Sequence, residues 1–198
     1  MKGIFIVIEG IDGSGKTIQS KLLQKELIKK GFKAVYTAEP SKGFIGNFLR
    51  KTSFKGIKLN PEFETLLFAA DRFYHINFEV IPNLNEGKIV VCDRYFYASL
   101  AYQGAQGVDL NWIKTVNKFV IKPDLAIYLD VPVEVGLSRI AKRKKTVFEE
   151  SEIEEKVREI YLKLVKENEL ILVNANKPIK DVKKEIINLT LSLLKNKE

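Results

Sequence analysis

Residues 10–17 match the phosphate-binding pattern G-x-x-x-x-G-K-S/T, and this loop restricts the fold more than any other part of the chain. The residues before it, 4–8, are apolar and mostly β-branched, as in a strand buried on both faces. Residues 17–30 after it carry leucine and isoleucine at helical spacing. Such a loop curls its N–H groups round phosphate oxygens at a helix N-terminus. The sequence therefore predicts a phosphate site formed by Gly10, Ile11, Asp12, Gly13, Ser14, Gly15, Lys16 and Thr17.

Two side chains give this loop its chemistry. Lys16 can reach the β- and γ-phosphates of a nucleotide, and the Thr17 hydroxyl can ligate Mg²⁺. The alternative is a glycine-rich turn that binds nothing. We favour a magnesium nucleotide, because both ends of the pattern and both flanking segments fit a phosphate loop.

Strand and helix patterns alternate along the rest of the chain. Strands are expected at 4–8, 33–37, 89–92, 125–129 and 170–173. Helices are expected at 17–30, 61–81, 109–119, from 132, at 151–165 and at 178–194, with the second ending near Pro82 and a capping box at Ser151. This alternation predicts an α/β fold with a doubly wound, five-stranded parallel sheet covered by helices on both faces.

The chain shows no internal repeat or linker, so a single domain over residues 1–198 is expected. The clearest irregular stretch is basic and lies near 142–148. We expect it to belong to a short, mobile lid at about 142–150.

Composition narrows the class of protein. The 198 residues are 45% hydrophobic, which is enough for one sizeable core. The single cysteine, Cys92, excludes an internal disulfide, and no Cys/His cluster suggests zinc. No apolar run is long enough to span a membrane and no signal segment is seen, so a cytoplasmic protein is expected. The net charge of +8 lies largely on segments that also carry glutamate, so nucleic acid is not expected as a partner.

Three further groups of residues fall where a parallel sheet collects ligands, at or near the carboxyl ends of strands. Asp93 and Arg94 follow the strand expected at 89–92. They could hold Mg²⁺ and a phosphate, or they could form an ordinary surface ion pair. Glu39 comes just after the strand expected at 33–37, where a turn that faces solvent is the simpler interpretation. Phe68 and Arg72 share a helix face. They could bind a base and its phosphate, although a core phenylalanine and an arginine paired with Asp71 or another neighbour are simpler.

The most specific motif is D-R-Y followed by S-x-A-Y-Q-G over residues 93–104. It is accompanied by Glu39-Pro40, by Arg50, by the segment 67–75, by 122–124 and by 148–149. Together with the phosphate loop, these segments resemble the thymidylate kinase family over essentially the whole chain. The resemblance implies a P-loop kinase fold and transfer of the γ-phosphate of Mg-ATP to thymidine monophosphate (dTMP) in nucleotide biosynthesis. It also implies a homodimer.

The resemblance implies roles residue by residue. The catalytic residues would be Asp12, Lys16, Arg94 and Arg143. ATP would be bound by the loop and Arg139, and Mg²⁺ by Thr17 and Asp93. The acceptor nucleotide would contact Glu39, Arg50, Phe68, Arg72, Arg94, Ser99, Tyr102 and Gln103.

Individual contacts follow from the same resemblance. Phe68 would stack on the pyrimidine, and Arg50 and Arg94 would hold the acceptor phosphate. Asp12 would approach the sugar 3′-hydroxyl, while Gln103 would help to read the base.

Two departures from the family pattern affect these expectations. Residues 41–43 are Ser-Lys-Gly, where Gly-Gly-Thr is usual in the family. A kinase that acts on another nucleoside monophosphate, or on several of them, therefore remains an alternative. Gly13 stands where some members carry a catalytic arginine, so Arg143 of the lid, helped by Lys144 or Arg139, is expected to supply that charge.

Two rivals from other classes remain. A P-loop switch or motor ATPase is disfavoured because Asn176-Lys177 lacks the aspartate of the guanine motif. A nucleic-acid-binding module rests on charge alone. His75 is expected to be a packed or surface histidine, and Cys92 a buried apolar residue.

Overall fold

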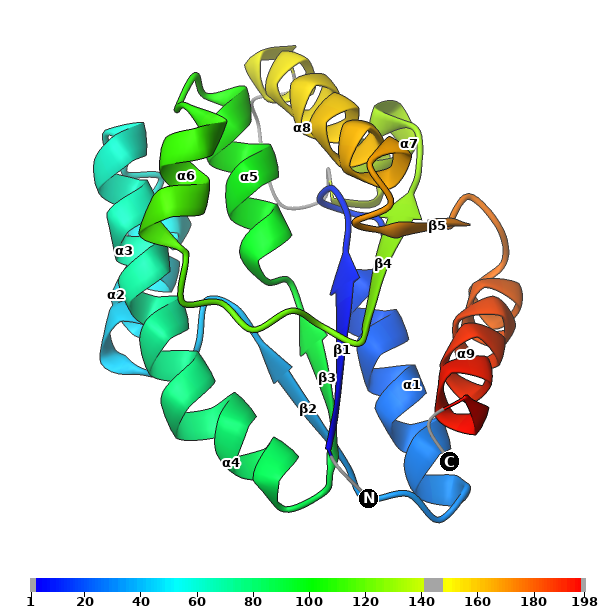
Figure 1. Ribbon diagram of the computed structural model, residues 1–198. Helices are drawn as coiled ribbons and strands as arrows, with labels where there is room; N and C mark the ends of the chain where they lie inside the picture. Colours follow the sequence, from blue (N-terminus) through cyan, green and yellow to red (C-terminus); the bar gives the residue numbers. More distant parts are fainter. Residues whose placement is uncertain (1–2, 141–147, 197–198) are drawn as a thin grey trace.

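The computed structural model describes residues 3–140 and 148–196, where five parallel strands form one sheet with helices on both faces (Figure 1). The strands are β1 (Ile4–Glu9), β2 (Ala34–Ala38), β3 (Ile89–Asp93), β4 (Leu125–Asp130) and β5 (Ile171–Asn174). Their order in the sheet is β2-β3-β1-β4-β5. The central strands β1 and β3 are buried at every position, which explains their continuous apolar sequences. The doubly wound α/β prediction is confirmed.

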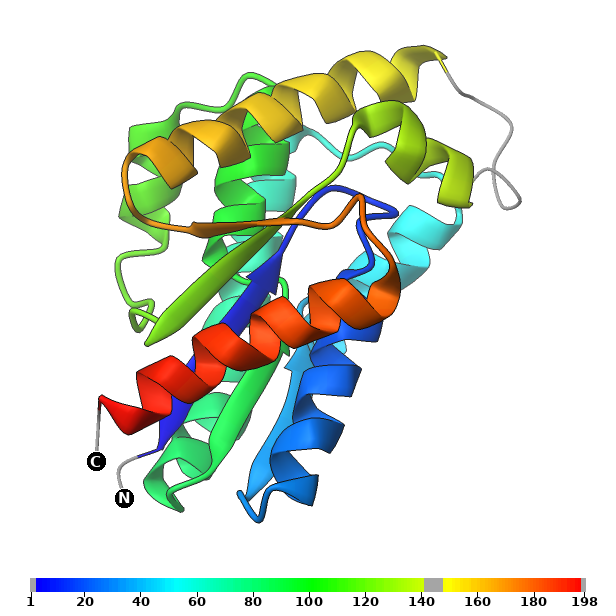
Figure 2. The ribbon, with the colours of Figure 1, turned by 90° about the vertical axis from the view of Figure 1, so that its right-hand side faces the viewer.

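The helices divide between the two faces and the carboxyl end of the sheet (Figures 1 and 2). Helices α1 and α9 pack side by side on one face, and α3, α4 and α5 cover the other. Helix α8 crosses the carboxyl end against α5 and α7. The bounds are α1 Lys16–Lys29, α2 Phe44–Phe54, α3 Pro61–His75, α4 Ile81–Asn85, α5 Phe96–Ala105, α6 Leu110–Val116, α7 Val133–Ile140, α8 Phe148–Lys166 and α9 Ile179–Lys195.

The helix that begins at Pro61 runs further than predicted. Asn60 caps it as expected, since its side chain accepts a hydrogen bond of 2.9 Å from the Phe63 N–H. The predicted end near Pro82 is wrong, because the π-helical turn η1 (Ile76–Val80) follows α3 and leads directly into α4. This wider turn precedes Pro82, whose ring and missing N–H would otherwise interrupt a regular helix.

Two other expectations about helices are corrected. The capping box at Ser151 is wrong, because α8 already begins at Phe148. Helices α2 and α5 were not predicted, and α5 covers most of the D-R-Y…Q-G motif. Of the expected lid, residues 148–150 belong to α8, while 142–147 lie outside the described residues.

The carboxyl ends of the three strands β2, β3 and β1 meet in register. Asp93 at the end of β3 pairs with Ile8 of β1 and with Ala38 of β2. The phosphate loop, Glu39 and Arg94 each follow directly and therefore lie at one edge. No helix among the described residues is long and apolar enough to cross a membrane.

Candidate active site

The phosphate loop takes the form predicted for it, between β1 and α1. Gly10, Gly13 and Gly15 have φ of 153°, 77° and 93°, the left-handed region that favours glycine. Lys16 is buried, and its Nζ donates to the Ile11 carbonyl oxygen at 2.7 Å. Burial, with Arg94 nearby, lowers the pKa of Lys16 to about 8. A bound polyphosphate would favour its charged form again.

Gly13 is fixed by a helix that is remote in sequence. A Cβ at this position would lie 2.0 Å from the backbone oxygen of Gly136 in α7. A Cβ on Gly136 would in turn lie 2.5 Å from the backbone oxygen of Asp12. The backbones of the loop and of α7 therefore touch, which leaves no room for an arginine side chain at position 13. Sequence reasoning missed Gly136, because nothing local marks this contact.

The predicted metal ligands come together beside the loop. The Thr17 hydroxyl donates to Asp93 Oδ2 at 2.5 Å, and the Tyr36 hydroxyl donates to the same oxygen at 3.4 Å. A hydroxyl and a carboxylate oxygen suit Mg²⁺, which commonly takes its remaining ligands from phosphates and water. No cluster of three or more His, Cys, Asp or Glu suitable for a metal is found in residues 3–140 and 148–196. Thr17 and Asp93 therefore fit a magnesium ion that takes its other ligands from the phosphates of a nucleotide and from water.

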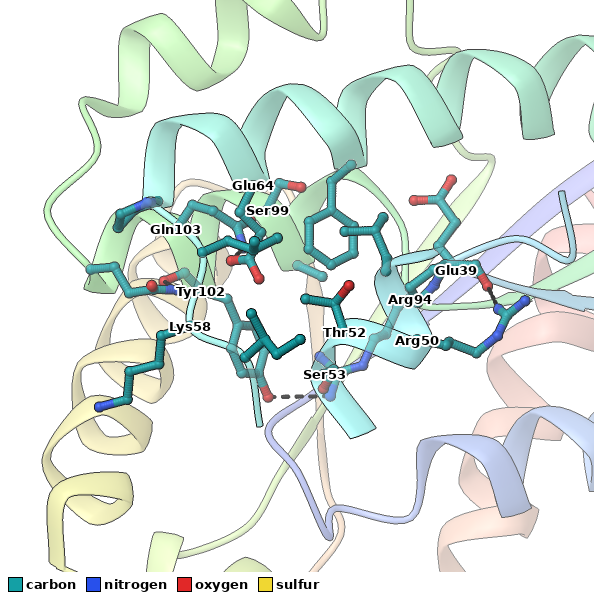
Figure 3. Close-up of a pocket in the computed structure, with 18 of the residues that line it drawn as sticks. Glu39, Arg50, Thr52, Ser53, Lys58, Glu64, Arg94, Ser99, Tyr102 and Gln103 are labelled. Carbon is teal, nitrogen blue, oxygen red and sulfur yellow. Dashed lines mark hydrogen bonds between the residues drawn. The ribbon is translucent and has the colours of Figure 1, made fainter. Parts of the chain in front are cut away.

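A cavity of about 1190 Å³ opens beside the loop, between α2, α3 and α5 (Figure 3). Most of its lining surface is apolar, as in a small-molecule site, although eight of the residues that line it are charged. Asp12, which is expected near the sugar, does not line it. Eight of the residues expected to contact the acceptor do: Glu39, Arg50, Phe68, Arg72, Arg94, Ser99, Tyr102 and Gln103.

Arg72 lies at the floor of this cavity in a network of long-range partners. Its Nε donates to Glu39 at 2.8 Å, and its Nη1 donates to the Asn117 side chain at 2.5 Å. Its Nη2 donates to Ser99 Oγ at 3.1 Å. Of the simpler pairings expected for Arg72, the one with Asp71 is wrong, because Asp71 instead accepts hydrogen bonds from the Ser41 N–H and hydroxyl. Full burial of the guanidinium requires these partners.

Glu39 is buried, so the simpler expectation of a solvent-facing turn is wrong. Besides Arg72, its carboxylate contacts His75 Nδ1 at 3.1 Å, and His75 Nε2 lies 2.7 Å from Thr37 Oγ1. His75 is thus packed, as expected, and it helps to hold Glu39 at the cavity wall. Cys92 is fully buried, also as expected.

Arg94 connects the phosphate loop to the cavity. Its Nη2 donates to Asp12 Oδ1. The same nitrogen donates to the Tyr102 hydroxyl at 3.2 Å (Figure 3). Its backbone has φ of 68°, which costs about 1 kcal/mol for a residue other than glycine. Its N–H donates to the Ile8 carbonyl oxygen at 3.0 Å, which holds this conformation at the end of β1. Its ion pair with Asp12 joins the two halves of the site.

The other predicted arginines are placed differently. Arg50 lines the cavity, but its guanidinium donates to the Pro40 carbonyl oxygen and to Asn47 Oδ1. Arg139 Nη1 donates to the Gly13 carbonyl oxygen at 3.2 Å, so it contacts the loop from α7. Arg143 and Lys144 lie outside the described residues.

Two buried carboxyl groups of the site were not foreseen. Glu9 accepts hydrogen bonds from the Tyr95 N–H and the Tyr161 hydroxyl, both at 2.8 Å, and burial raises its pKa to about 7. Glu154 of α8 faces Asp12, and burial first, then the Asp12 charge, raises its pKa to about 7. Glu9 could have been noticed, as an acid that ends an apolar strand directly before the loop. Glu154 depends on how α8 packs, which no local pattern shows.

Comparisons with known proteins agree with this geometry. The family model described as thymidylate kinase matches residues 8–186. A probable thymidylate kinase of Pyrococcus horikoshii is 48% identical over 197 residues, which cover 96% of each chain. A probable thymidylate kinase of Methanocaldococcus jannaschii is 40% identical and covers 93% of this chain and 94% of its own. The chain therefore belongs to the thymidylate kinase family.

Proposed function

We propose that the protein transfers the γ-phosphoryl group of Mg-ATP to dTMP, giving dTDP and ADP. The observation that carries this proposal is the cavity beside the phosphate loop, which is lined by eight of the residues expected to contact the acceptor. The Arg94–Asp12 pair lies between the two, where the phosphates of donor and acceptor would meet. Family membership and the relatives' names support the same reaction.

The chemistry requires alignment and charge neutralisation more than acid–base groups. An oxygen of the acceptor phosphate forms a bond to the γ-phosphorus while the bond to the β–γ bridging oxygen breaks, and ADP takes the charge. Lys16 and the loop N–H groups would hold the β- and γ-phosphates, and Arg94 the acceptor phosphate. Magnesium, bound near Thr17 and Asp93, would neutralise phosphate charge. Phe68 and Arg72 would hold the base inside the cavity.

The choice of acceptor needs its own test, because residues 41–43 depart from the usual family pattern. In the structure, Ser41 Oγ donates to Asp71 at 2.6 Å, and Gly43 N–H donates to Ser41 Oγ at 2.9 Å. Hydrogen bonds within the segment 41–43 and to Asp71 of α3 therefore hold this loop in place.

Steady-state kinetics with dTMP, dUMP, dCMP, dAMP and dGMP tests which nucleotide is the acceptor. We expect the highest kcat/KM with dTMP, and equal or better activity with another nucleotide would favour the broader kinase.

The helix face opposite the sheet supports a homodimer. Leu66, Phe73, Tyr74 and Phe78 of α3 and η1 are between 46% and 69% exposed, and the Tyr74 and Phe78 rings stack at 4.6 Å. These positions recur at helical spacing, so they form one apolar stripe that a second copy can cover. ATP and free nucleotides are abundant in the cytoplasm, where we also propose that this protein works.

Phe78→Glu should convert the dimer to a monomer, because it places a charge at the most exposed position of the apolar stripe. Sedimentation velocity should show a species near 22.6 kDa for this variant and about twice that mass for the unmodified protein. Ile179→Glu is the matched control, since Ile179 is also exposed but begins α9 on the other face. A monomeric unmodified protein would contradict the proposal.

A further inference from the structure

Glu64 and Gln103 form a hydrogen bond inside the wall of the cavity. Gln103 Nε2 donates to Glu64 Oε2 at 2.9 Å, and both residues line the cavity. Glu64 lies in the first turn of α3 and Gln103 lies in α5, so the bond joins two helices that flank the cavity. Figure 3 shows both at the end of the cavity away from Glu39 and Arg50.

This bond determines which way the Gln103 amide faces. An ionised carboxylate only accepts hydrogen bonds, so the NH₂ group of Gln103 must point to Glu64. The carbonyl oxygen is then turned away from Glu64 and is the atom that can accept from a ligand. Gln103 is 3% exposed, so this orientation is held by packing as well.

One helical turn before Gln103, Ser99 offers the complementary group. Its Oγ accepts a hydrogen bond from Arg72 Nη2, which leaves the hydroxyl proton for another acceptor. Residues four apart lie on the same helix face. The α5 wall of the cavity therefore presents a donor and an acceptor side by side.

We propose that Glu64 is a positioning residue that selects acceptor bases carrying an N3–H. Thymine and uracil present a carbonyl acceptor at C4 and an N–H donor at N3, which match Ser99 and the Gln103 carbonyl. Cytosine presents an amino donor at C4 and an unprotonated N3, so a polar group on each side would be left unpaired. This inference rests on the proposed function.

The test compares Glu64→Gln with Glu62→Gln, using dUMP and dCMP as acceptors. These two nucleotides differ only at C4 and N3, so the ratio of their kcat/KM values reports how this edge is read. A glutamine at position 64 can offer either its NH₂ or its carbonyl, so the Gln103 amide can turn. We expect the dUMP/dCMP ratio to fall at least about tenfold, mainly through KM. Glu62→Gln removes the same charge from the same helical turn and should leave the ratio unchanged.

A double-variant cycle separates positioning from general damage. In a Gln103→Ala background the Glu64→Gln change should alter the ratio no further, because the group that Glu64 orients is gone. An unchanged dUMP/dCMP ratio in Glu64→Gln, with both acceptors weakened equally, would overturn the inference. It would also be overturned if Glu64→Gln lowered the ratio as much in the Gln103→Ala background as in the unmodified protein. Failure of the unmodified protein to phosphorylate any pyrimidine monophosphate would instead overturn the proposed function.

Discussion

Gly13→Ala should lower ATP-dependent turnover by at least about a hundredfold, because misplacing a catalytic loop by roughly 1 Å has that effect. The added Cβ would lie 2.0 Å from the Gly136 backbone oxygen, and φ of 77° disfavours any side chain. Backbone cannot yield as a flexible side chain can, so either the loop or α7 must move. Steady-state kinetics with dTMP and a measured Kd for ATP would both show the loss.

The matched control is Gly31→Ala. Gly31 follows α1 at the end remote from the loop, has a comparable φ of 89°, and would place its Cβ in open space. This variant carries the same backbone penalty, roughly 1–2 kcal/mol, without the overlap. It should lower the melting temperature and leave kcat unchanged. Full activity in Gly13→Ala would contradict the contact between the loop and α7.

Arg143→Ala should lower kcat by roughly a thousandfold, the effect usual for an arginine that neutralises a transferred phosphoryl group. The contact between Gly13 and Gly136 leaves the loop unable to carry such an arginine, so the charge must come from elsewhere in the chain. Arg139 and Arg94 already donate to Gly13 and Asp12. We therefore keep Arg143 as the proposed source, although it lies outside the described residues.

The KM for dTMP should stay nearly constant in Arg143→Ala, because the proposed role concerns the transition state alone. Lys145→Ala removes one charge from the same basic segment and serves as the control. Single-turnover rates measure the chemical step directly. An unchanged rate in Arg143→Ala would transfer the role to Lys144 or Arg139.

The parts of the fold that the sequence predicts are those with a strong local pattern. Each of the five strands contains a run of mostly apolar residues, and the parallel arrangement follows from their alternation with helices. Helix α5 was missed because its segment combines tyrosine, glutamine and glycine and lacks a clear apolar stripe. The continuation of α3 past Pro82 was missed because a π-helical turn leaves no sequence signal.

The sequence indicated eight residues that line the cavity, but it did not indicate which partners these residues contact. The motif residues identified the lining of the cavity, because strand ends and helix faces place such residues together. The partners of Arg72 could not be predicted, since Glu39 and Asn117 lie 33 and 45 residues away in the sequence. The contact between Gly13 and Gly136 likewise depends on tertiary packing.

The transfer of label from γ-phosphate-labelled ATP tests the central claim most directly. Incubation with Mg²⁺ and dTMP should place the label in dTDP, in a one-to-one ratio with ADP formed, and little label should appear without dTMP. Release of the label as inorganic phosphate at a rate independent of dTMP would contradict the account, because it would show an ATPase whose cavity does not present an acceptor to the phosphate loop.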